Sequence, residues 1–548
     1  MSMCLIMGKC AFTGYIRHKN GERTLNKIKK GIIVLLHIGL LLGCLGVVLV
    51  MSDLAGGRKH EVQEDQNQAW KEERNVEPEE PKMNDEERKL KDSENQKMTD
   101  LERAKAERQE WLDAYHKWRL ENQKRYGQEE SSMVQDEEEI YVPPTLMLAS
   151  DLHYMSSTTH DDGIAFQYLL ENDDGKVSQY SDVIVDALVE EAVRSKPSAL
   201  LLTGDITLNG ELENHLKLAE KLRRVQEAGV QVLVIPGNHD IQNQNAATYF
   251  GTERKEAEYL KSGEAFYEIY REFGFDQAIS RDEDSLSYLY GLDEKHWLLL
   301  LDSCQYEDYN HVNGKIQLGT LTWMEEQLSQ AKERGIHVTV AAHHNLLSES
   351  RLYTTECTLE NHQQVIELLE RYEVPLYISG HLHAQRIKKH QREPGTDPDS
   401  YGIYEIVLSP YALPPCQYGL LAWDEKDHMV FETKKAPVED YSEFLKTTIR
   451  NQVKKNISGV PDDLKEQMAN LYAELYFDYC AGNRISLDMV DTTKAYKLWE
   501  RVAPDSRYMA EMGQMIADVR DAMHGWSWLS GPGIETQKEE DGVSVQRE

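Results

Sequence analysis

The chain has few cationic residues relative to its acidic ones. Its 548 residues include 61 Lys and Arg against 95 Asp and Glu, which gives a formal net charge of −34. Nonspecific binding to nucleic acid needs clustered Lys and Arg that displace counterions from the phosphate backbone. The charge therefore argues against a nuclease or another nucleic-acid-binding protein, and no nucleic-acid partner is expected.

Cysteine is also scarce, and no two cysteines form a Cys-x-x-Cys pair. Of the seven, three lie before or inside an N-terminal apolar run, and four are widely spaced in the rest of the chain: Cys304, Cys357, Cys416 and Cys480. A structural zinc site needs closely spaced cysteine ligands, which these four do not provide. We expect them to be packed thiols rather than a disulfide framework, although a location outside the cytoplasm would permit one disulfide bond.

Five short polar runs each follow an apolar stretch of strand length. The stretches are 145–149, 199–202, 232–235, 337–342 and 375–378, and the runs are Asp151-Leu152-His153, Gly204-Asp205, Gly237-Asn238-His239-Asp240, His343-His344 and Gly380-His381-Leu382-His383. Short apolar stretches rich in β-branched residues are typical of buried parallel strands. The carboxyl ends of such strands meet at one edge of a sheet, where binding sites collect. We therefore expect the runs to form one site.

The residue types in these runs suit a pair of divalent cations. Two ions a few ångströms apart need oxygen and imidazole donors and a carboxylate that bridges them. The runs contain no thiolate, so a structural zinc site is disfavoured, while Mn, Fe or Zn all fit the donors. Two such cations lower the pKa of bound water and clamp a phosphoryl oxygen, which makes a metal-bridging hydroxide the expected nucleophile. Neither G-x-S-x-G nor G-x-x-x-x-G-K-[ST] occurs in the runs, which leaves serine acyl transfer and ATP-driven work without support.

A single Gly-Asp or Gly-Asn pair is an ordinary turn, but five runs in this order form a recognisable pattern. The order D-x-H, G-D, G-N-H-D, a later His and G-H-x-H resembles the calcineurin-like metallophosphoesterases. The resemblance covers residues 145–433, and it is greatest to the cyclic-nucleotide phosphodiesterase branch that carries a C-terminal helical domain. It implies an α/β fold, a four-layer α/β/β/α sandwich with two facing sheets.

The resemblance also implies a role for each residue of the runs. One metal would be held by Asp151, His153 and His383, the other by Asn238, His343 and His381, with Asp205 as the bridge. His239 would face the phosphate without binding metal and protonate the leaving alkoxide or stabilise charge, and Asp240 would orient it. His344 stays open as an alternative ligand to His343 or as a substrate contact.

The N-terminal part of the chain predicts a membrane anchor. Residues 32–51 form an apolar run long enough to span a bilayer as a helix, and the preceding residues 1–31 are basic. The positive-inside rule places that basic segment in the cytoplasm and the catalytic part outside, at the plasma membrane with a single pass. A cleaved signal peptide and a lipid anchor at Cys44 are the alternatives to an uncut signal anchor.

Changes in composition along the rest of the chain indicate its division into domains. We expect a charged, partly helical stalk at 52–144, the catalytic domain at 145–435, a helical domain at 436–530 and a disordered tail at 531–548. In the catalytic domain, further strands are expected at 401–408, 419–423 and 428–433, and the expected helices of the next domain are 441–454, 461–480, 487–502 and 506–524. Apolar residues near heptad spacing in the stalk allow either a dimer or a plain spacer helix.

These observations predict a membrane-anchored, metal-dependent phosphodiesterase that hydrolyses small phosphate esters outside the cytoplasm, with cyclic nucleotides as a candidate substrate. The ligand set is shared by phosphomonoesterases, so a phosphomonoesterase is one alternative. A surface-anchored binding protein without activity is another. The presence of Asp205 and His239 argues against this last alternative, because an inactive relative is expected to lose one of them.

Overall fold

The computed structural model describes residues 141–391, 401–424, 427–485, 490, 493–521 and 527–529. These residues belong to one compact unit that begins at Tyr141. The predicted basic segment 1–31, membrane segment 32–51 and tail, and the stalk up to residue 140, lie outside the described residues. Within the described part, no helix is both long enough and apolar enough to cross a membrane.

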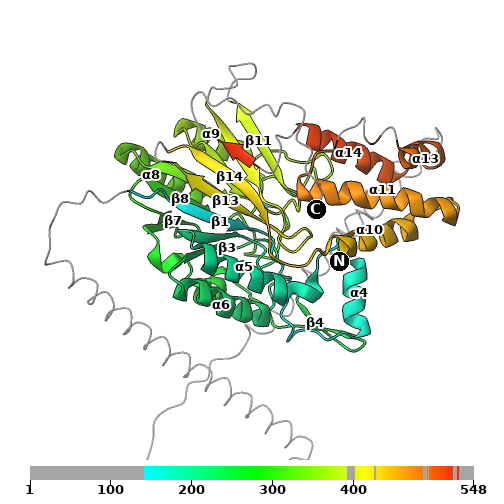
Figure 1. Ribbon diagram of the computed structural model, residues 1–548. Coiled ribbons are helices and arrows are strands. Elements are labelled where there is room, and N and C mark those ends of the chain that lie inside the picture. The colour runs from blue at the N-terminus through cyan, green and yellow to red at the C-terminus, as the bar shows by residue number, and fades with distance from the viewer. Residues whose placement is uncertain are drawn as a thin grey trace, which may run out of the picture. The chain divides into compact units, whose positions relative to one another are not determined.

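Two mixed sheets form the centre of this unit (Figure 1). The first has the order β15-β14-β13-β1-β2-β3, from Ser527–Leu529, Met429–Lys435, Gln417–Trp423, Thr145–Ala149, Ala199–Thr203 and Gln231–Ile235. The second has the order β11-β12-β10-β9-β8-β7-β6, from Arg386–Gln391, Gly402–Val407, Leu376–Ser379, His337–Ala342, His296–Leu301, Tyr288–Gly291 and Ser280–Arg281. In the first sheet β1, β2 and β3 run parallel, and in the second β8, β9, β10 and β12 do.

The five strands predicted before the polar runs are all present. β1 and β9 have the predicted bounds, β2 and β3 are each one residue longer, and β10 is shifted by one residue. Every residue of β2 is buried, as expected for a parallel strand covered on both faces. The strands predicted near the end of the catalytic domain correspond to β12, β13 and β14.

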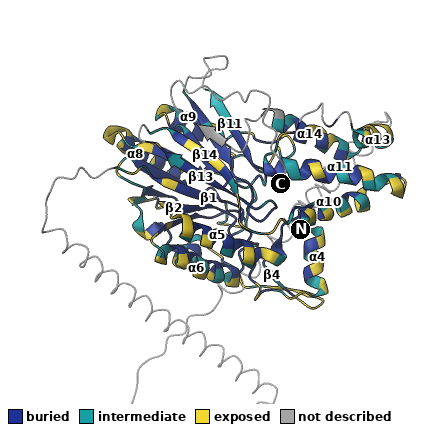
Figure 2. Cartoon of the chain, in the orientation of Figure 1, coloured by how far each residue is buried: buried dark blue, intermediate teal, exposed yellow. Residues whose placement is uncertain are grey.

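Helices cover the outer faces of both sheets, and the sheets pack on each other. Helices α5 (Ser181–Ser195) and α6 (Leu212–Glu227) pack on the first sheet, and α8 (Leu318–Arg334) and α9 (His362–Arg371) pack on the second. In β8, Leu298 and Leu300 join the core between the sheets, while the alternate residues Leu299 and Leu301 pack under α8 and α9. Figure 2 shows β1 and β2 buried and the outward sides of α5 and α6 exposed. The expected order of helix, sheet, sheet and helix is therefore confirmed.

Smaller elements and the C-terminal helices complete the unit. The smaller elements are α4 (Ile164–Asn172), α7 (Gly263–Tyr270), the 3₁₀ turns at Ser178–Tyr180 and Phe275–Gln277, and the hairpin of β4 (Ala247–Phe250) and β5 (Glu253–Glu256). The later helices are α10 (Ser442–Asn456), α11 (Asp462–Ala481), α13 (Lys494–Val502) and α14 (Arg507–Asp521). Their core includes Leu382, Val407 and Leu413 from the sandwich.

Helices α10 and α11 match the predicted 441–454 and 461–480 closely. Helix α13 begins at Lys494 rather than at 487, and parts of the predicted helices 487–502 and 506–524 lie outside the described residues. The expectation of a purely helical region at 436–530 is wrong, because β15 lies within it and pairs with β14. A separate helical domain stays a prediction, because these helices share one compact unit with the sheets.

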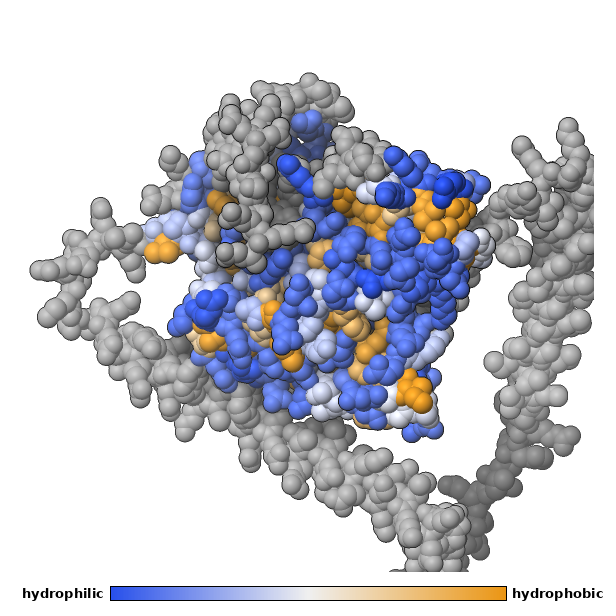
Figure 3. All heavy atoms as spheres, turned by 45° about the vertical axis from the view of Figure 1, so that its right-hand side comes forward, coloured by the Kyte–Doolittle hydropathy of each residue, from blue (hydrophilic) through white to orange (hydrophobic). Residues whose placement is uncertain are grey.

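The surface and the cysteines agree with a packed α/β unit. The four later cysteines, Cys304, Cys357, Cys416 and Cys480, are free and buried, which confirms the expectation of packed thiols. On the face that Figure 3 presents, hydrophilic residues predominate among the coloured atoms, and hydrophobic residues lie in separate patches.

Candidate metal centre

The polar runs meet at the carboxyl ends of strands from both sheets. The first sheet contributes Asp151 and His153 after β1, Asp205 after β2 and Asn238 after β3. The second sheet contributes His343 after β9, and His381 and His383 after β10. The structure thus brings together the seven residues that the sequence predicts as metal ligands.

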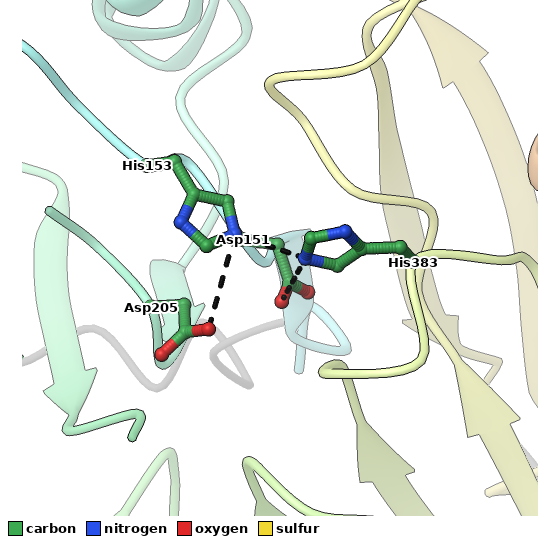
Figure 4. Close-up of side chains that lie close together, drawn as sticks. All are labelled: Asp151, His153, Asp205 and His383. Atoms are coloured by element: carbon green, nitrogen blue, oxygen red, sulfur yellow. Dashed lines mark hydrogen bonds and ion pairs between the residues drawn. The ribbon is translucent and has the colours of Figure 1, made fainter. Parts of the chain in front are cut away.

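One group of side chains, the first cluster, consists of Asp151, His153, Asp205 and His383. Its four donor atoms all lie within 4.8 Å of one another (Figure 4). The Nε2 atoms of His153 and His383 are 2.9 Å apart. His383 Nε2 lies 3.4 Å from Asp151 Oδ1, and His153 Nε2 lies 3.8 Å from Asp205 Oδ2. Such convergence of carboxylate and imidazole donors could hold one divalent cation.

The second cluster consists of Asp205, Asn238, His343 and His381. Donor atoms of Asp205, His343 and His381 lie within 4.8 Å of one another. His343 Nε2 is 3.2 Å from Asn238 Oδ1 and 3.4 Å from Asp205 Oδ1. One carboxylate oxygen of Asp205 therefore faces each cluster, which is the arrangement a bridging ligand requires.

Charge and burial make the two clusters suitable for cations. Asp151 and Asp205 are almost fully buried, and a buried carboxylate needs a positive partner. Burial raises the pKa of Asp205, but His343, His239 and His153 outweigh this effect and hold that pKa well below its ordinary value. Against their own burial, Asp205 raises the pKa of His343 to about 9, and Asp151 and Asp174 raise that of His383 to about 10. The donors present thus fit two divalent cations, which would displace the protons on these imidazoles.

Five of the candidate ligands have left-handed backbone conformations. They are Asp151 (φ 52°), His153 (φ 40°), Asp205 (φ 48°), His381 (φ 66°) and His383 (φ 57°). This conformation costs a non-glycine residue about 1–2 kcal/mol, and it persists where the surrounding structure enforces it. Each of these residues lies in a loop that leaves a strand. The strained backbone conformation is part of the turn that directs the side chain into the site.

The glycines of the runs allow the loops to approach closely. A Cβ on Gly237 would lie 2.1 Å from the backbone nitrogen of Asp205, and one on Gly380 would lie 1.8 Å from Ser150 Oγ. Gly204 has φ 89°, and a Cβ there would lie 2.5 Å from His343 Nδ1. No larger residue fits at these positions without moving a candidate ligand.

Hydrogen bonds to the outer atoms of three histidines fix their rings. His343 Nδ1 donates to the carbonyl of Thr203 at 2.9 Å, and His381 Nε2 donates to the carbonyl of Glu356 at 3.1 Å. His383 Nδ1 contacts a carboxylate oxygen of Asp174 at 2.9 Å. These partners leave His343 Nε2, His381 Nδ1 and His383 Nε2 for a metal. None of these three partners could be predicted from the sequence, because a backbone carbonyl has no sequence signal and Asp174 belongs to none of the five runs.

His239 lies beside the clusters with its ring fixed from outside. Its Nδ1 donates to the carbonyl of Leu208 at 2.7 Å and lies 3.2 Å from Asn209 Oδ1. Its Nε2 lies 3.9 Å from Asp205 Oδ2, and 30% of the side chain is exposed. Since a carbonyl only accepts, Nδ1 carries a hydrogen, and Nε2 is the nitrogen left to exchange a proton with a substrate.

The prediction that Asp240 orients His239 is wrong. The Asp240 carboxylate accepts hydrogen bonds from the backbone nitrogens of Ile206, Thr207 and Gly237 and from the Thr207 hydroxyl. Burial and the neighbouring Asp205 raise the pKa of Asp240 to about 7. Asp240 therefore ties the loop after β2 to the loop after β3. The carbonyl of Leu208, rather than Asp240, holds the ring of His239.

The geometry also separates the two adjacent histidines after β9. His344 contacts the Ser303 hydroxyl through Nδ1 at 2.8 Å and the carbonyl of Val312 through Nε2 at 2.9 Å. Both ring nitrogens are thus engaged away from the clusters. His343 is the histidine of this pair whose Nε2 faces Asp205 and Asn238.

A comparison with known protein families identifies part of this chain. Residues 144–385 match the family model of the calcineurin-like phosphoesterases. Among solved structures, a dimetal phosphatase from Danio rerio is 16% identical with a TM-score of 0.39, covering 55% of this chain and 98% of its own. Purple acid phosphatase PPD1 from yellow lupin seeds is 13% identical with a TM-score of 0.38, covering 55% of this chain and 53% of its own. A search among curated proteins gives no match.

The fold and the two clusters define a metal-dependent phosphoester hydrolase. Residues 144–385 form a calcineurin-like phosphoesterase domain. This confirms the family expected from the five runs. The matched residues end before α10, so the match does not extend to the C-terminal helices.

The close approach at Gly237 predicts a selective loss of metal. In Gly237→Ala, the new Cβ would overlap the backbone of Asp205 and displace the residue shared by both clusters. We expect the bound Mn²⁺ per chain to fall and turnover to fall about 10-fold or more, the effect of disturbing the surroundings of metal ligands. Elemental analysis after desalting measures the metal.

Gly513→Ala is the matched control for this prediction. It places the same methyl group on α14 with no atom within 4 Å, so metal content and turnover should match the unsubstituted chain. Normal metal content in Gly237→Ala would contradict the close packing of these two loops.

Proposed function

We propose that the chain is a metal-dependent phosphodiesterase. The observation that carries the proposal is the pair of clusters that share Asp205, with the partly exposed and unligated His239 beside them. Two divalent cations bound there would acidify water and polarise phosphoryl oxygens. His239 can exchange a proton with the leaving oxygen, which completes the requirements for ester hydrolysis.

The chain's own side chains define the remaining steps. The ring of His239 is held by Leu208, so Nε2 is positioned to donate a proton to the leaving alkoxide when the imidazole is protonated. The hydrogen bonds on His343, His381 and His383 hold their donor atoms toward the site before substrate arrives. The strained loops add to this preorganisation, because they position the carboxylates without rearrangement.

The pairing of Lys176 supports a diester rather than a monoester as the substrate. A monoester dianion carries one more negative charge than a diester, and enzymes commonly neutralise it with Arg or Lys. Lys176, whose partner Asp174 contacts His383, is already paired with two carboxylates, Asp173 and Asp174. It is therefore not free to hold a phosphate dianion. Cyclic nucleotides are the proposed diesters, because the motifs of residues 145–433 resemble the cyclic-nucleotide branch of the family.

The purified chain should hydrolyse diesters faster than monoesters in a metal-dependent manner. After chelation and addition of Mn²⁺, we expect cleavage of bis-p-nitrophenyl phosphate and cyclic AMP to exceed that of p-nitrophenyl phosphate. Asp205→Ala and Asn238→Ala should abolish turnover through metal loss, whereas Asp463→Ala, on an exposed part of α11, should not. A preference for the monoester would instead favour a phosphatase, and inactivity on all three would favour the binding protein.

Removal of His239 should slow the hydrolysis of esters with a poor leaving group more than that of esters with a good one. Nitrophenolate leaves readily without a proton, so His239→Ala should cleave bis-p-nitrophenyl phosphate at nearly the normal rate. Turnover of cyclic AMP, whose leaving group is an alkoxide, should fall by about 10²–10⁴-fold. Metal content should stay unchanged, because the Nε2 of His239 is not among the candidate donors. Equal losses on both substrates would rule out the role as a proton donor.

We also propose that the enzyme is anchored in the plasma membrane with its catalytic part outside the cytoplasm. The support is the apolar run 32–51 behind the basic segment 1–31. In cells that express the full chain, activity should sediment with membranes, resist washing at high pH and be released by detergent. A variant without residues 32–51 should be soluble. Activity of the full chain in the soluble fraction would contradict the anchor.

A further inference from the structure

The loop between α4 and α5 reaches the metal centre from outside the five runs. One Asp174 oxygen lies 2.9 Å from His383 Nδ1, and its other oxygen accepts a hydrogen bond from Lys176 Nζ at 2.6 Å. Lys176 Nζ also lies 3.0 Å from Asp173 Oδ1. The three side chains are 7 to 16% exposed, so this charged group is largely shielded from water.

Asp174 differs from the other partners of the candidate histidine ligands. His343 and His381 donate to neutral backbone carbonyls. His153 Nδ1 is buried and has no hydrogen-bond partner among the described residues. Within the first cluster, His383 is therefore the imidazole whose orientation is fixed by a hydrogen bond, and its partner carries a charge.

Helix α10 holds this loop in place. Gln452 Nε2 donates to the carbonyl of Asp173 at 2.7 Å and to that of Glu171 at 3.2 Å. Gly175, with φ 99°, lies against Leu445, since a Cβ there would be 2.9 Å from Leu445 Cγ. The loop is thus fixed by two hydrogen bonds and a close packing contact from one helix.

We propose that Asp174 is a positioning residue for His383 and that Gln452 sets the place of Asp174. The affinity of the first cluster for its cation would then depend on α10, which lies beyond the matched residues 144–385. The inference deepens the proposed function and rests on the metal centre described there. It assigns the C-terminal helices a task in building that centre.

The physical basis is the effect of an anionic partner on a metal-bound imidazole. A carboxylate on the outer nitrogen fixes the tautomer and the ring orientation and makes the inner nitrogen a better donor, and its loss typically weakens metal affinity 10–100-fold. Lys176 keeps Asp174 charged and turned toward the ring by holding its other oxygen. Without Asp174, His383 would keep its contacts to Asp151 and His153 but lose the bond that fixes its outer nitrogen.

Asp174→Asn tests the proposal, with Asp173→Asn as the matched control. Both changes remove one carboxylate from the same loop and from the same lysine, but only Asp174 contacts His383. We expect Asp174→Asn to weaken one of two Mn²⁺ sites by about 10–100-fold, and Asp173→Asn to change it less than about 2-fold. Competition with a chromophoric chelator measures both dissociation constants without substrate.

Electron paramagnetic resonance provides a second measurement. A bound but isolated Mn²⁺ ion is a result that a general folding defect would not produce. At two equivalents of Mn²⁺ the unsubstituted chain should give the signal of a spin-coupled pair, and Asp174→Asn should give the signal of an isolated ion. The metal-free forms of the two variants should unfold at similar temperatures, because each loses one of the two carboxylates paired with Lys176. Unchanged affinity and an unchanged coupled signal in Asp174→Asn would overturn the proposal.

Gln452→Leu tests the contribution of α10 even if Asp174→Asn does not fold. It removes both hydrogen bonds to the loop, and Asn451→Leu makes a matched change at the exposed neighbouring position. We expect the same Mn²⁺ site to weaken several-fold in Gln452→Leu and to stay unchanged in Asn451→Leu. Equal affinities in the two variants would contradict the role of α10, whereas failure of the unsubstituted chain to bind two ions would contradict the proposed function itself.

Discussion

Burial of the Asp205 carboxylate constrains the whole site. A buried negative charge is costly without positive partners, and Asp205 lies among His153, His239 and His343, with one oxygen toward each cluster. Divalent cations would satisfy this charge more fully than these imidazoles do. The other candidate ligands are arranged around this requirement, because they approach Asp205 from both sheets. The close packing at Gly237 leaves Asp205 little freedom to turn away.

The candidate ligands are also held by residues that are not themselves candidate ligands. The ligands lie in loops that leave the strands of two sheets. Hydrogen bonds from other residues hold these loops and the ligand side chains in place. Asp240 ties two ligand loops together, the carbonyls of Thr203 and Glu356 hold two imidazoles, and α10 holds the loop of Asp174. The geometry of the donors is thus a property of the entire compact unit rather than of the five runs alone.

The sequence predicted the elements whose signal is local. Apolar stretches identified β1, β2, β3, β9 and β10 to within a residue, and the runs behind them identified the candidate ligands. Contacts between distant segments could not be predicted. The predicted role of Asp240 was wrong, because its hydrogen-bond partners lie in the loop after β2. Residues that are adjacent in sequence, such as His239 and Asp240, need not contact each other through their side chains. The choice between His343 and His344 required the positions of Ser303 and Val312, and Asp174 has no sequence motif.

The pairing of β1 has a consequence for the order of folding. β1 lies between β2 and β13, and its register joins Thr145 to Ala422. During synthesis from the N-terminus, β1, β2 and β3 can associate early, but one edge of β1 stays unpaired until β13 has been made. Pairings between such distant segments form slowly, and an exposed strand edge promotes aggregation. The nascent sheet is therefore vulnerable until β13 has been synthesised, and a chaperone that shields the open edge of β1 would improve the yield of folded enzyme.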